Sequence, residues 1–207
     1  MSYMLFLRET SMGICAALAL LSGAVAAQTI ALQPLGKVAS AELDSVRRIV
    51  VASYPNAKVS VLPKRELPAS AWYPSRSRWR AEKLVAALEV WKPAGFDRIA
   101  GLTEQDISTT KGSNVDWGIF GYGQIGGPAC MISGFRLAKG TNLAGRARRL
   151  AWTVAHELGH TFGLEHCPVP GCLMEDAAGK AATLDRSSGH FCPRCKAFLS
   201  HQGIATN

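Results

Sequence analysis

Apolar residues recur along this chain with the period of a helix in three places. In each stretch they lie three or four positions apart, which aligns them on one side of a helix. The helices predicted in this way cover residues 41–52, 77–91 and 142–162. Asn142 or Thr141 would cap the third, and Ser40 would cap the first. One or two further helical turns are expected over residues 196–201.

Short apolar runs between Gly and Pro residues predict strands that alternate with these helices. They cover residues 58–62, 98–102, 115–122 and 129–137. Strands alternating with helices are typical of an α/β fold with a mixed, twisted sheet. The remaining stretches lack either period, and we expect an extended lead-in over 28–40, a polar connection over 103–112 and a loop over 175–190.

The N-terminal stretch has the pattern of a signal peptide. Arg8 precedes an apolar run from Ile14 to Ala27, and Val25-Ala26-Ala27 before Gln28 suits signal peptidase, with a cut after Ala26 as second choice. The run is shorter than the about 20 apolar residues that cross a bilayer, so an uncleaved anchor is the less favoured alternative. We therefore predict a signal peptide over residues 1–27, export to the periplasm or medium, and no stable membrane insertion.

The chain is basic, with 23 Lys and Arg, 15 Asp and Glu and a formal net charge of +8. A basic surface can attract acidic substrates, anionic envelope components or nucleic acid. Its cations are scattered, apart from clusters at 76–80 and 146–149, the second of which we interpret as the solvated start of a helix. We expect no nucleic-acid partner and a monomer.

The strongest chemical signal is the spacing His156-Glu157-x-x-His160-x-x-Gly163-x-x-His166. On a helix, His156 and His160 point from one face and can share a zinc ion. Glu157 lies between them, placed to take a proton from water at the metal. Gly163 tolerates the positive φ that would end the helix and bring His166 round as a third ligand. Three protein ligands and an open fourth position are typical of a catalytic zinc site.

Cysteines continue the pattern beyond His166. Of six in the chain, Cys15 lies in the predicted signal peptide, and Cys130 lies in an apolar run that predicts a buried, inert thiol. The other four are Cys167, Cys172, Cys192 and Cys195. The whole string, HExxHxxGxxHC-x4-CxM-x17-CxxC, resembles the signature of the archaemetzincins, a branch of the metzincin metallopeptidases.

This resemblance implies a metzincin-like fold with two or three helices, one of them the long zinc-binding helix, and a small, irregular, Cys-rich C-terminal part. It divides residues 28–207 into an N-terminal subdomain to about 163 and a C-terminal subdomain over 164–207. It implies that Met174 packs beneath the zinc site and that Cys130–Phe135 or Trp117–Gly121 forms the rim along which an extended peptide pairs.

The resemblance also implies that the four cysteines bind a second, structural zinc. An exported chain meets an oxidising compartment, so two disulfides remain the alternative. The implied activity is hydrolysis of peptide bonds by an endopeptidase or aminopeptidase-like enzyme. A catalytically weak or inactive homologue that binds peptides or metal is the second hypothesis. A zinc-ribbon nucleic-acid binder is the third, and it leaves the histidine motif unexplained.

Overall fold

The computed structural model describes residues 27–207, so the predicted signal peptide lies outside the described residues except for Ala27. The elements in chain order are β1 (Thr29–Leu35), α1 (Ser40–Ser53), β2 (Lys58–Val61), β3 (Trp72–Tyr73), β4 (Arg78–Arg80), α2 (Ala81–Trp91), β5 (Arg98–Thr103), β6 (Ile107–Lys111), β7 (Asn114–Ile119), β8 (Gly121–Gly123), β9 (Ala129–Ser133), α3 (Leu143–Thr161), α4 (Ala181–Arg186) and α5 (Pro193–His201). None of the helices in residues 27–207 combines the length and apolar character that a bilayer crossing requires.

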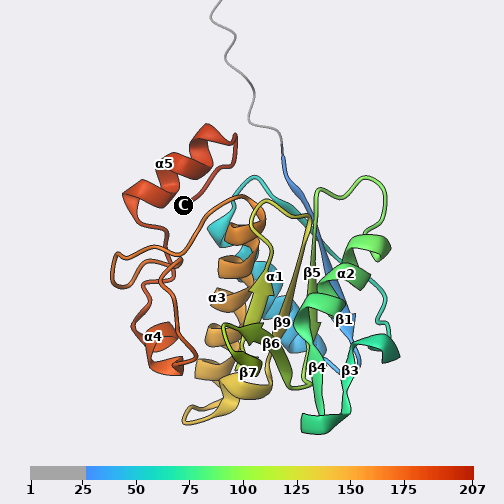
Figure 1. Ribbon diagram of the computed structural model, residues 1–207. Helices are drawn as coiled ribbons and strands as arrows, with labels where there is room; N and C mark the ends of the chain where they lie inside the picture. The colour runs from blue at the N-terminus through green and yellow to red at the C-terminus, as the bar shows by residue number, and fades with distance from the viewer. Residues whose placement is uncertain (1–26) are drawn as a thin grey trace, which may run out of the picture.

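A five-stranded sheet with the order β2-β1-β5-β9-β8 forms the middle layer (Figure 1). The first four strands are parallel, and β8 runs antiparallel to β9 at the edge. Alternate side chains of the central strands enter two separate cores: Cys130 and Ile132 pack with α1 and α3, whereas Ala129 and Met131 pack with α2. The α/β fold predicted from the sequence is confirmed, with α1 and α3 on one face of the sheet and α2 on the other.

The first strand corrects the prediction of an extended lead-in over residues 28–40. β1 lies between β2 and β5, and its residues from Ile30 to Leu35 are buried. A parallel strand covered on both faces needs no alternation of polar and apolar residues, so the period-two pattern was absent.

A second sheet with the order β3-β4-β6-β7 corrects three further expectations. The predicted polar connection contains β6, which forms a hairpin with β7. The single strand predicted over 115–122 is divided into β7 and β8, which belong to different sheets. The predicted helix over 77–91 begins only at Ala81, because Arg78–Arg80 pairs with β3 and β6 as β4. Local periodicity does not reveal such pairing partners.

The helix predictions near the site were more accurate. α3 follows the predicted range, and its N-cap is Asn142, whose side chain accepts a hydrogen bond from Gly145 N at 2.9 Å. α1 also follows its prediction, although its N-cap is Ala39 and Ser40 makes no cap hydrogen bond. In the C-terminal part, the loop expected over 175–190 contains the short helix α4, and the final turns extend over α5.

The sequence suggested that the arginine cluster at 146–149 is the solvated start of a helix, and this prediction is wrong. Arg146 forms ion pairs with Glu42 and Glu104, and only Arg148 is exposed. Arg149 is 4% exposed and donates to both carboxylate oxygens of Asp185, at 2.8 and 2.6 Å. It also donates to two backbone carbonyls in the turn before α3, Leu137 O at 2.9 Å and Lys139 O at 2.8 Å. These arginines therefore tie α3 to its neighbours.

We expect Arg149→Ala to lower the free energy of unfolding by about 1–3 kcal/mol, because it leaves buried carbonyl groups without donors. Chemical denaturation of both proteins measures the loss. Arg148→Ala is the matched control: its exposed guanidinium lies over the Trp152 ring at 5.3 Å, and we expect a loss below about 1 kcal/mol. Equal losses in the two variants would contradict the assignment of Arg149 as the buried link.

Candidate metal centre

The last two turns of α3 and the turn that follows them place the histidines. Gly163 adopts φ +98°, and its N–H donates to His160 O at 2.9 Å, while Leu164 N donates to Gly159 O at 3.0 Å. Such a left-handed residue ends a helix and turns the chain back. The predicted role of Gly163 as the helix end is therefore confirmed, and the turn carries His166 back toward α3.

The three histidines meet as the motif predicted. Their ring centroids lie 4.7 Å apart for His156 and His160, 5.4 Å for His156 and His166, and 4.8 Å for His160 and His166. One nitrogen from each lies within 4.8 Å of the others. His156 and His160 are largely buried, whereas the His166 side chain is 49% exposed. The cluster is therefore open to solvent on the side of His166.

Backbone carbonyls orient the two buried rings. His156 Nδ1 lies 2.7 Å from Leu173 O, and His160 Nδ1 lies 2.7 Å from Leu164 O. A carbonyl only accepts, so each Nδ1 bears the proton and each Nε2 presents a lone pair. Burial also lowers the pKa of both rings, that of His156 to about 3, which keeps them neutral.

The two Nε2 atoms lie 3.1 Å apart. Since both are acceptors, they do not hydrogen-bond to one another, and a cation between them would satisfy both. Two imidazole nitrogens on a tetrahedral zinc lie about 3.3 Å apart, as follows from Zn–N distances of about 2.0–2.1 Å. The histidines therefore fit zinc in both protonation and spacing.

Glu157 lies beside the histidines and is 7% exposed. Burial raises the pKa of its carboxyl group to about 8, although a hydrogen bond from the Gly123 amide lowers it. A bound cation would lower the pKa of Glu157 again, because it favours the charged carboxylate. A group balanced in this way is suited to exchange a proton near neutral pH.

Two cavities meet at this cluster. One, of about 270 Å³, is lined by His156, Glu157 and His166 together with residues of β6, β7 and the segment 175–179. The other, of about 480 Å³, is lined by β8 and by Glu157, His160 and His166. A larger groove of about 990 Å³ lies at the starts of α1 and α3 and is lined by none of the predicted site residues. The candidate cleft thus extends to both sides of Glu157.

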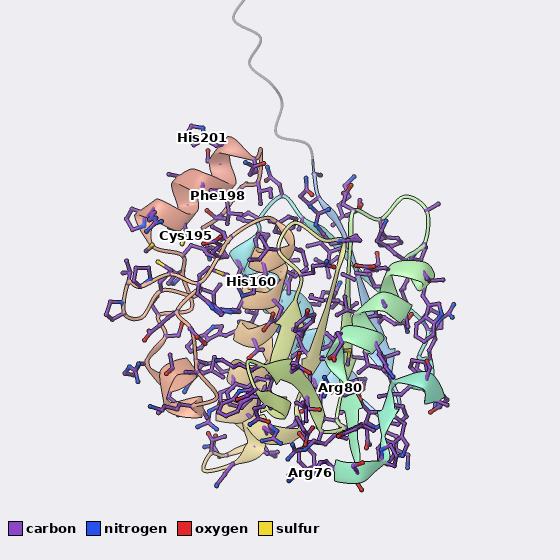
Figure 2. All side chains as sticks on the ribbon, in the orientation of Figure 1. Arg76, Arg80, His160, Cys195, Phe198 and His201 are labelled. Carbon is purple, nitrogen blue, oxygen red and sulfur yellow. The ribbon has the colours of Figure 1, made fainter. Side chains whose placement is uncertain are left out.

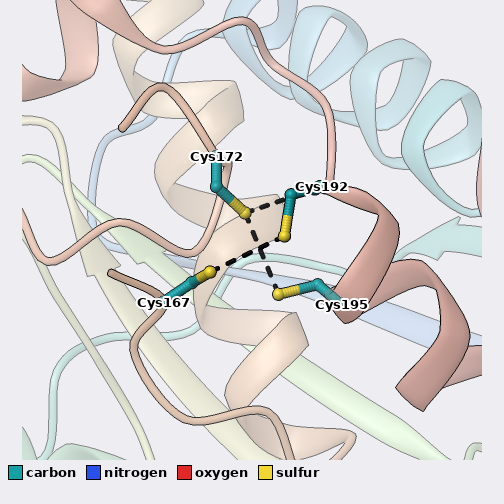
Figure 3. A group of neighbouring side chains, drawn as sticks. All are labelled: Cys167, Cys172, Cys192 and Cys195. Atoms are coloured by element: carbon teal, nitrogen blue, oxygen red, sulfur yellow. Dashed lines mark hydrogen bonds between the residues drawn. The ribbon is translucent and has the colours of Figure 1, made fainter. Parts of the chain in front are cut away.

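The four predicted cysteines form a second cluster beside α3 (Figure 3). Cys167 Sγ lies 3.6 Å from Cys192 Sγ, and Cys172 Sγ lies 3.9 Å from Cys195 Sγ. All four sulfur atoms lie within 4.8 Å of one another. Four thiolates on a tetrahedral zinc lie about 3.8 Å apart, given a Zn–S distance of about 2.3 Å. The cluster therefore fits one zinc ion held by four sulfur atoms.

The two clusters are close in the chain and distant from the basic stretch at 76–80. In Figure 2, His160 lies near the middle of the molecule and Cys195 at the start of α5, whereas Arg76 lies at the lower end and Arg80 between Arg76 and His160. Arg78 in that stretch pairs with Asp106 at 2.9 Å and with Asp116 at 2.8 Å, and Arg80 pairs with Glu82. Carboxylates of the same chain thus neutralise these two cations.

Met174 lies under the zinc helix, where the resemblance placed it. It is fully buried, and a Cβ atom added at Gly159 would lie 2.6 Å from its sulfur. Its carbonyl accepts a hydrogen bond from Cys167 N at 2.8 Å. Met174 thereby joins the helix that bears His156 and His160 to the segment that bears the cysteines.

Several groups around the site were not predicted. Cys130–Phe135 is not a free rim, because β9 lies between β5 and β8. The edge beside Glu157 is β8, which overlaps the other proposed rim, Trp117–Gly121, only at Gly121. Asp176 Oδ2 also lies 3.9 Å from His166 Nδ1. The spacing Gly121-x-Gly123 after an apolar run was the available signal for β8.

Comparison with known proteins agrees with the motif. Residues 141–201 match the family model described as Peptidase family M54. The chain is 34% identical to an archaemetzincin of Methanopyrus kandleri over 143 residues, which cover 69% of this chain and 78% of that protein. It is 31% identical to an archaemetzincin of Archaeoglobus fulgidus over 140 residues, which cover 68% of this chain and 80% of that protein.

Solved structures give the same result. The crystal structure of the Methanopyrus kandleri archaemetzincin matches with a TM-score of 0.75 and 28% identity, covering 88% of this chain and 98% of that one. The Archaeoglobus fulgidus archaemetzincin, solved in complex with malonate, matches with a TM-score of 0.68 and 26% identity, covering 83% and 99%. In sequence and in fold, the chain belongs to the archaemetzincin family of zinc-dependent metallopeptidases.

Proposed function

We propose that this chain cleaves peptide bonds within polypeptides, with His156, His160 and His166 as the ligands of the catalytic zinc and Glu157 as the general base. The observation that supports this most strongly is the convergence of the three imidazoles with a buried carboxylate at one open cleft. An ordinary polar cluster has no need for two imidazoles that are held neutral with their Nε2 atoms facing each other.

Zinc bound by the three histidines would polarise the peptide carbonyl and make a water molecule more acidic. Glu157 takes the proton of the attacking water on its carboxylate and then gives it to the nitrogen of the leaving amine. A cation bound by the histidines would lower the raised pKa of Glu157, so that its carboxylate form is available to accept the proton. Leu173 and Leu164 carbonyls keep the two imidazoles in the tautomer that leaves Nε2 free.

The substrate in this proposal is an extended peptide that lies along β8. Edge strands present unpaired main-chain groups, and peptides add to them as a further strand. Cavities on both sides of Glu157 give room for residues before and after the cleaved bond. This favours an endopeptidase over an aminopeptidase-like enzyme.

The second candidate is a catalytically weak homologue that binds peptides or metal. The position after Met174 is what favours it: some metzincins have there a tyrosine that stabilises the transition state, whereas this chain has Glu175 and Asp176. Glu175 Oε1 accepts a hydrogen bond from Arg186 at 2.9 Å, so it does not replace a phenol donor.

Incubation of the zinc-loaded protein with a complex peptide library distinguishes the two candidate functions, because only a peptidase cleaves the peptides. We expect cuts by the wild type, loss of about 10²–10⁴-fold of kcat in Glu157→Ala, and unchanged zinc content in that variant. His160→Ala should lose both the zinc and the cuts, because it removes a ligand. Mass spectrometry of the peptides and metal analysis give the readouts. If the wild type and Glu157→Ala cut equally, Glu157 is not the base; if neither cuts at full zinc occupancy, the binding protein is the better description.

We propose further that Cys167, Cys172, Cys192 and Cys195 bind a second, structural zinc. Hydrogen bonds from the Cys195 amide and from neighbouring thiols, acting against burial, lower the pKa of Cys192 to about 7. The thiols therefore include one that ionises readily, as a metal ligand must.

Metal analysis is expected to give two zinc ions per wild-type chain and one in His160→Ala, whose loss is confined to the catalytic site. Cys172→Ser should lose the other ion and part of its folding free energy, since binding and folding are coupled at such sites. Thiol titration of the unfolded, metal-free protein provides the control. The zinc assignment predicts five titratable thiols in the chain from residue 28, the four of the cluster and Cys130; two disulfides, which leave Cys130 alone, would overturn it.

Export is proposed on the N-terminal pattern alone, with the signal peptide over residues 1–27. N-terminal sequencing of the protein recovered from a secreting host is expected to begin at Gln28, or at Ala27 if the second-choice site is used. Recovery of the chain beginning at Met1 in the membrane fraction would instead support the uncleaved anchor.

A further inference from the structure

The edge strand β8 lies directly against the carboxylate that the proposed mechanism uses. A Cβ atom built at Gly121 would lie 2.5 Å from Glu157 Oε1, 2.6 Å from its Cγ and 2.7 Å from its Cδ. Non-bonded carbon atoms are in ordinary contact at about 3.5–4.0 Å, so no side chain fits there while Glu157 keeps its position. Gly121 has an unremarkable φ, and its lack of a side chain is therefore required by this contact alone.

Gly123 makes a different contact with the same residue. A Cβ atom there would lie 2.6 Å from the backbone oxygen of Glu157, 3.0 Å from Oε2 and 3.0 Å from the Cβ atom of His160. The first glycine thus leaves room for the carboxylate, and the second leaves room for the backbone of α3. Both are needed for the strand to approach the helix so closely.

The register of the sheet decides where the main-chain groups of these glycines point. Ser133 N donates to Phe120 O at 2.8 Å, so Phe120 and Tyr122 use their main-chain groups to bond with β9. In an antiparallel pair, the residues between them direct N–H and C=O to the opposite side. Gly121 and Gly123 therefore direct theirs to the free edge, and Glu157 Oε2 lies beside Gly123, 3.0 Å from the position that a Cβ atom there would take.

We propose that Gly121 and Gly123 are positioning residues for Glu157: Gly121 provides the space for its carboxylate, and the Gly123 amide fixes the orientation of that carboxylate through a hydrogen bond. A carboxylate on a flexible side chain would otherwise sample several rotamers, and an error of about 1 Å in a reacting group can cost about 100-fold in rate. This inference rests on the proposed function of Glu157 for its catalytic consequence, but its structural core is independent of activity.

The same arrangement limits how a peptide binds to β8. With the Gly123 N–H engaged by Glu157 as proposed, an incoming strand has Gly121 N–H, Gly121 C=O and Gly123 C=O for pairing. A substrate carbonyl placed opposite Gly123 N–H would compete with Glu157. Productive peptides therefore pair through Gly121 and leave the Gly123 amide to the base.

Hydrogen exchange at the Gly123 amide tests the structural core without any substrate. The protein contains 20 glycines, so labelling glycine alone with ¹⁵N gives a simple spectrum. We expect the Gly123 amide to exchange at least about tenfold faster in Glu157→Ala than in the wild type, because an edge amide without an acceptor exchanges readily. Glu157→Gln keeps an acceptor oxygen and should restore slow exchange. The Gly126 amide, which donates to His160 O at 2.9 Å, is the internal control and should not change.

Kinetics of Gly121→Ala tests the catalytic consequence. We expect kcat to fall by about 100-fold while KM changes by less than about twofold and zinc content is unchanged. Gly127→Ala is the matched control, since the three atoms nearest to its new methyl group all belong to the flexible side chain of Gln124. In the Gly121→Ala background, Glu157→Asp should cost less than in the wild type, because the shorter side chain relieves the contact and the two changes are not additive.

Separate outcomes identify what has failed. Unchanged Gly123 exchange in Glu157→Ala, or strictly additive effects of the two substitutions, overturns the positioning role even if the protein is an active peptidase. A wild type that cuts nothing overturns the proposed function, and the exchange experiment then decides the positioning role by itself. Loss of zinc from Gly121→Ala would mean that the substitution displaces α3 and its histidines, which contradicts the assignment of Gly121 to the carboxylate of Glu157.

Discussion

The site depends on the hydrogen bonds that the buried rings of His156 and His160 make to backbone carbonyls of the chain that follows their own helix. Buried polar side chains are costly without partners, and a histidine is a useful ligand only in the correct tautomer. Both requirements are met at once, because Gly163 turns the chain back and brings Leu164 and then Leu173 to the rings. The turn at Gly163 thus fixes the tautomer of the two histidines as well as the path of the chain.

The sequence predicted the chemistry of this site better than its surroundings. His156, Glu157, His160, Gly163 and His166 follow from a spacing that is fixed within one helix and one turn, so local geometry was sufficient. The rim strand was missed because the split of residues 115–122 into β7 and β8 depends on which distant strands they meet. β1 was missed for a related reason, since burial on both faces removes the alternation by which a strand is recognised.

Two charged residues of α3 also show which features follow from the local sequence and which depend on distant parts of the chain. Arg149 stands in the solvated-looking first half of α3, yet it is buried because Asp185 and two carbonyls come to it from other elements. Glu157 shows the converse, a charged residue in a helix whose close neighbours are two glycines. The helix period predicted the direction of Glu157 correctly, whereas it placed Arg149 in solvent, because the partners that bury Arg149 come from distant parts of the chain.

The cysteine cluster bears on the catalytic site through the order of the chain. His156 and His160 are held by a regular helix, whereas His166 lies beyond it in a segment with no regular structure, and its side chain is the most exposed of the three. The next residue, Cys167, belongs to the sulfur cluster, and its amide donates to Met174 O under the zinc helix. A zinc ion or disulfides that join the four cysteines would therefore also limit how far His166 can move. Such an anchor lowers the loop entropy that would otherwise oppose the meeting of His166 with the other two histidines. The immediate succession of His166 and Cys167 therefore couples the position of His166 to the sulfur cluster.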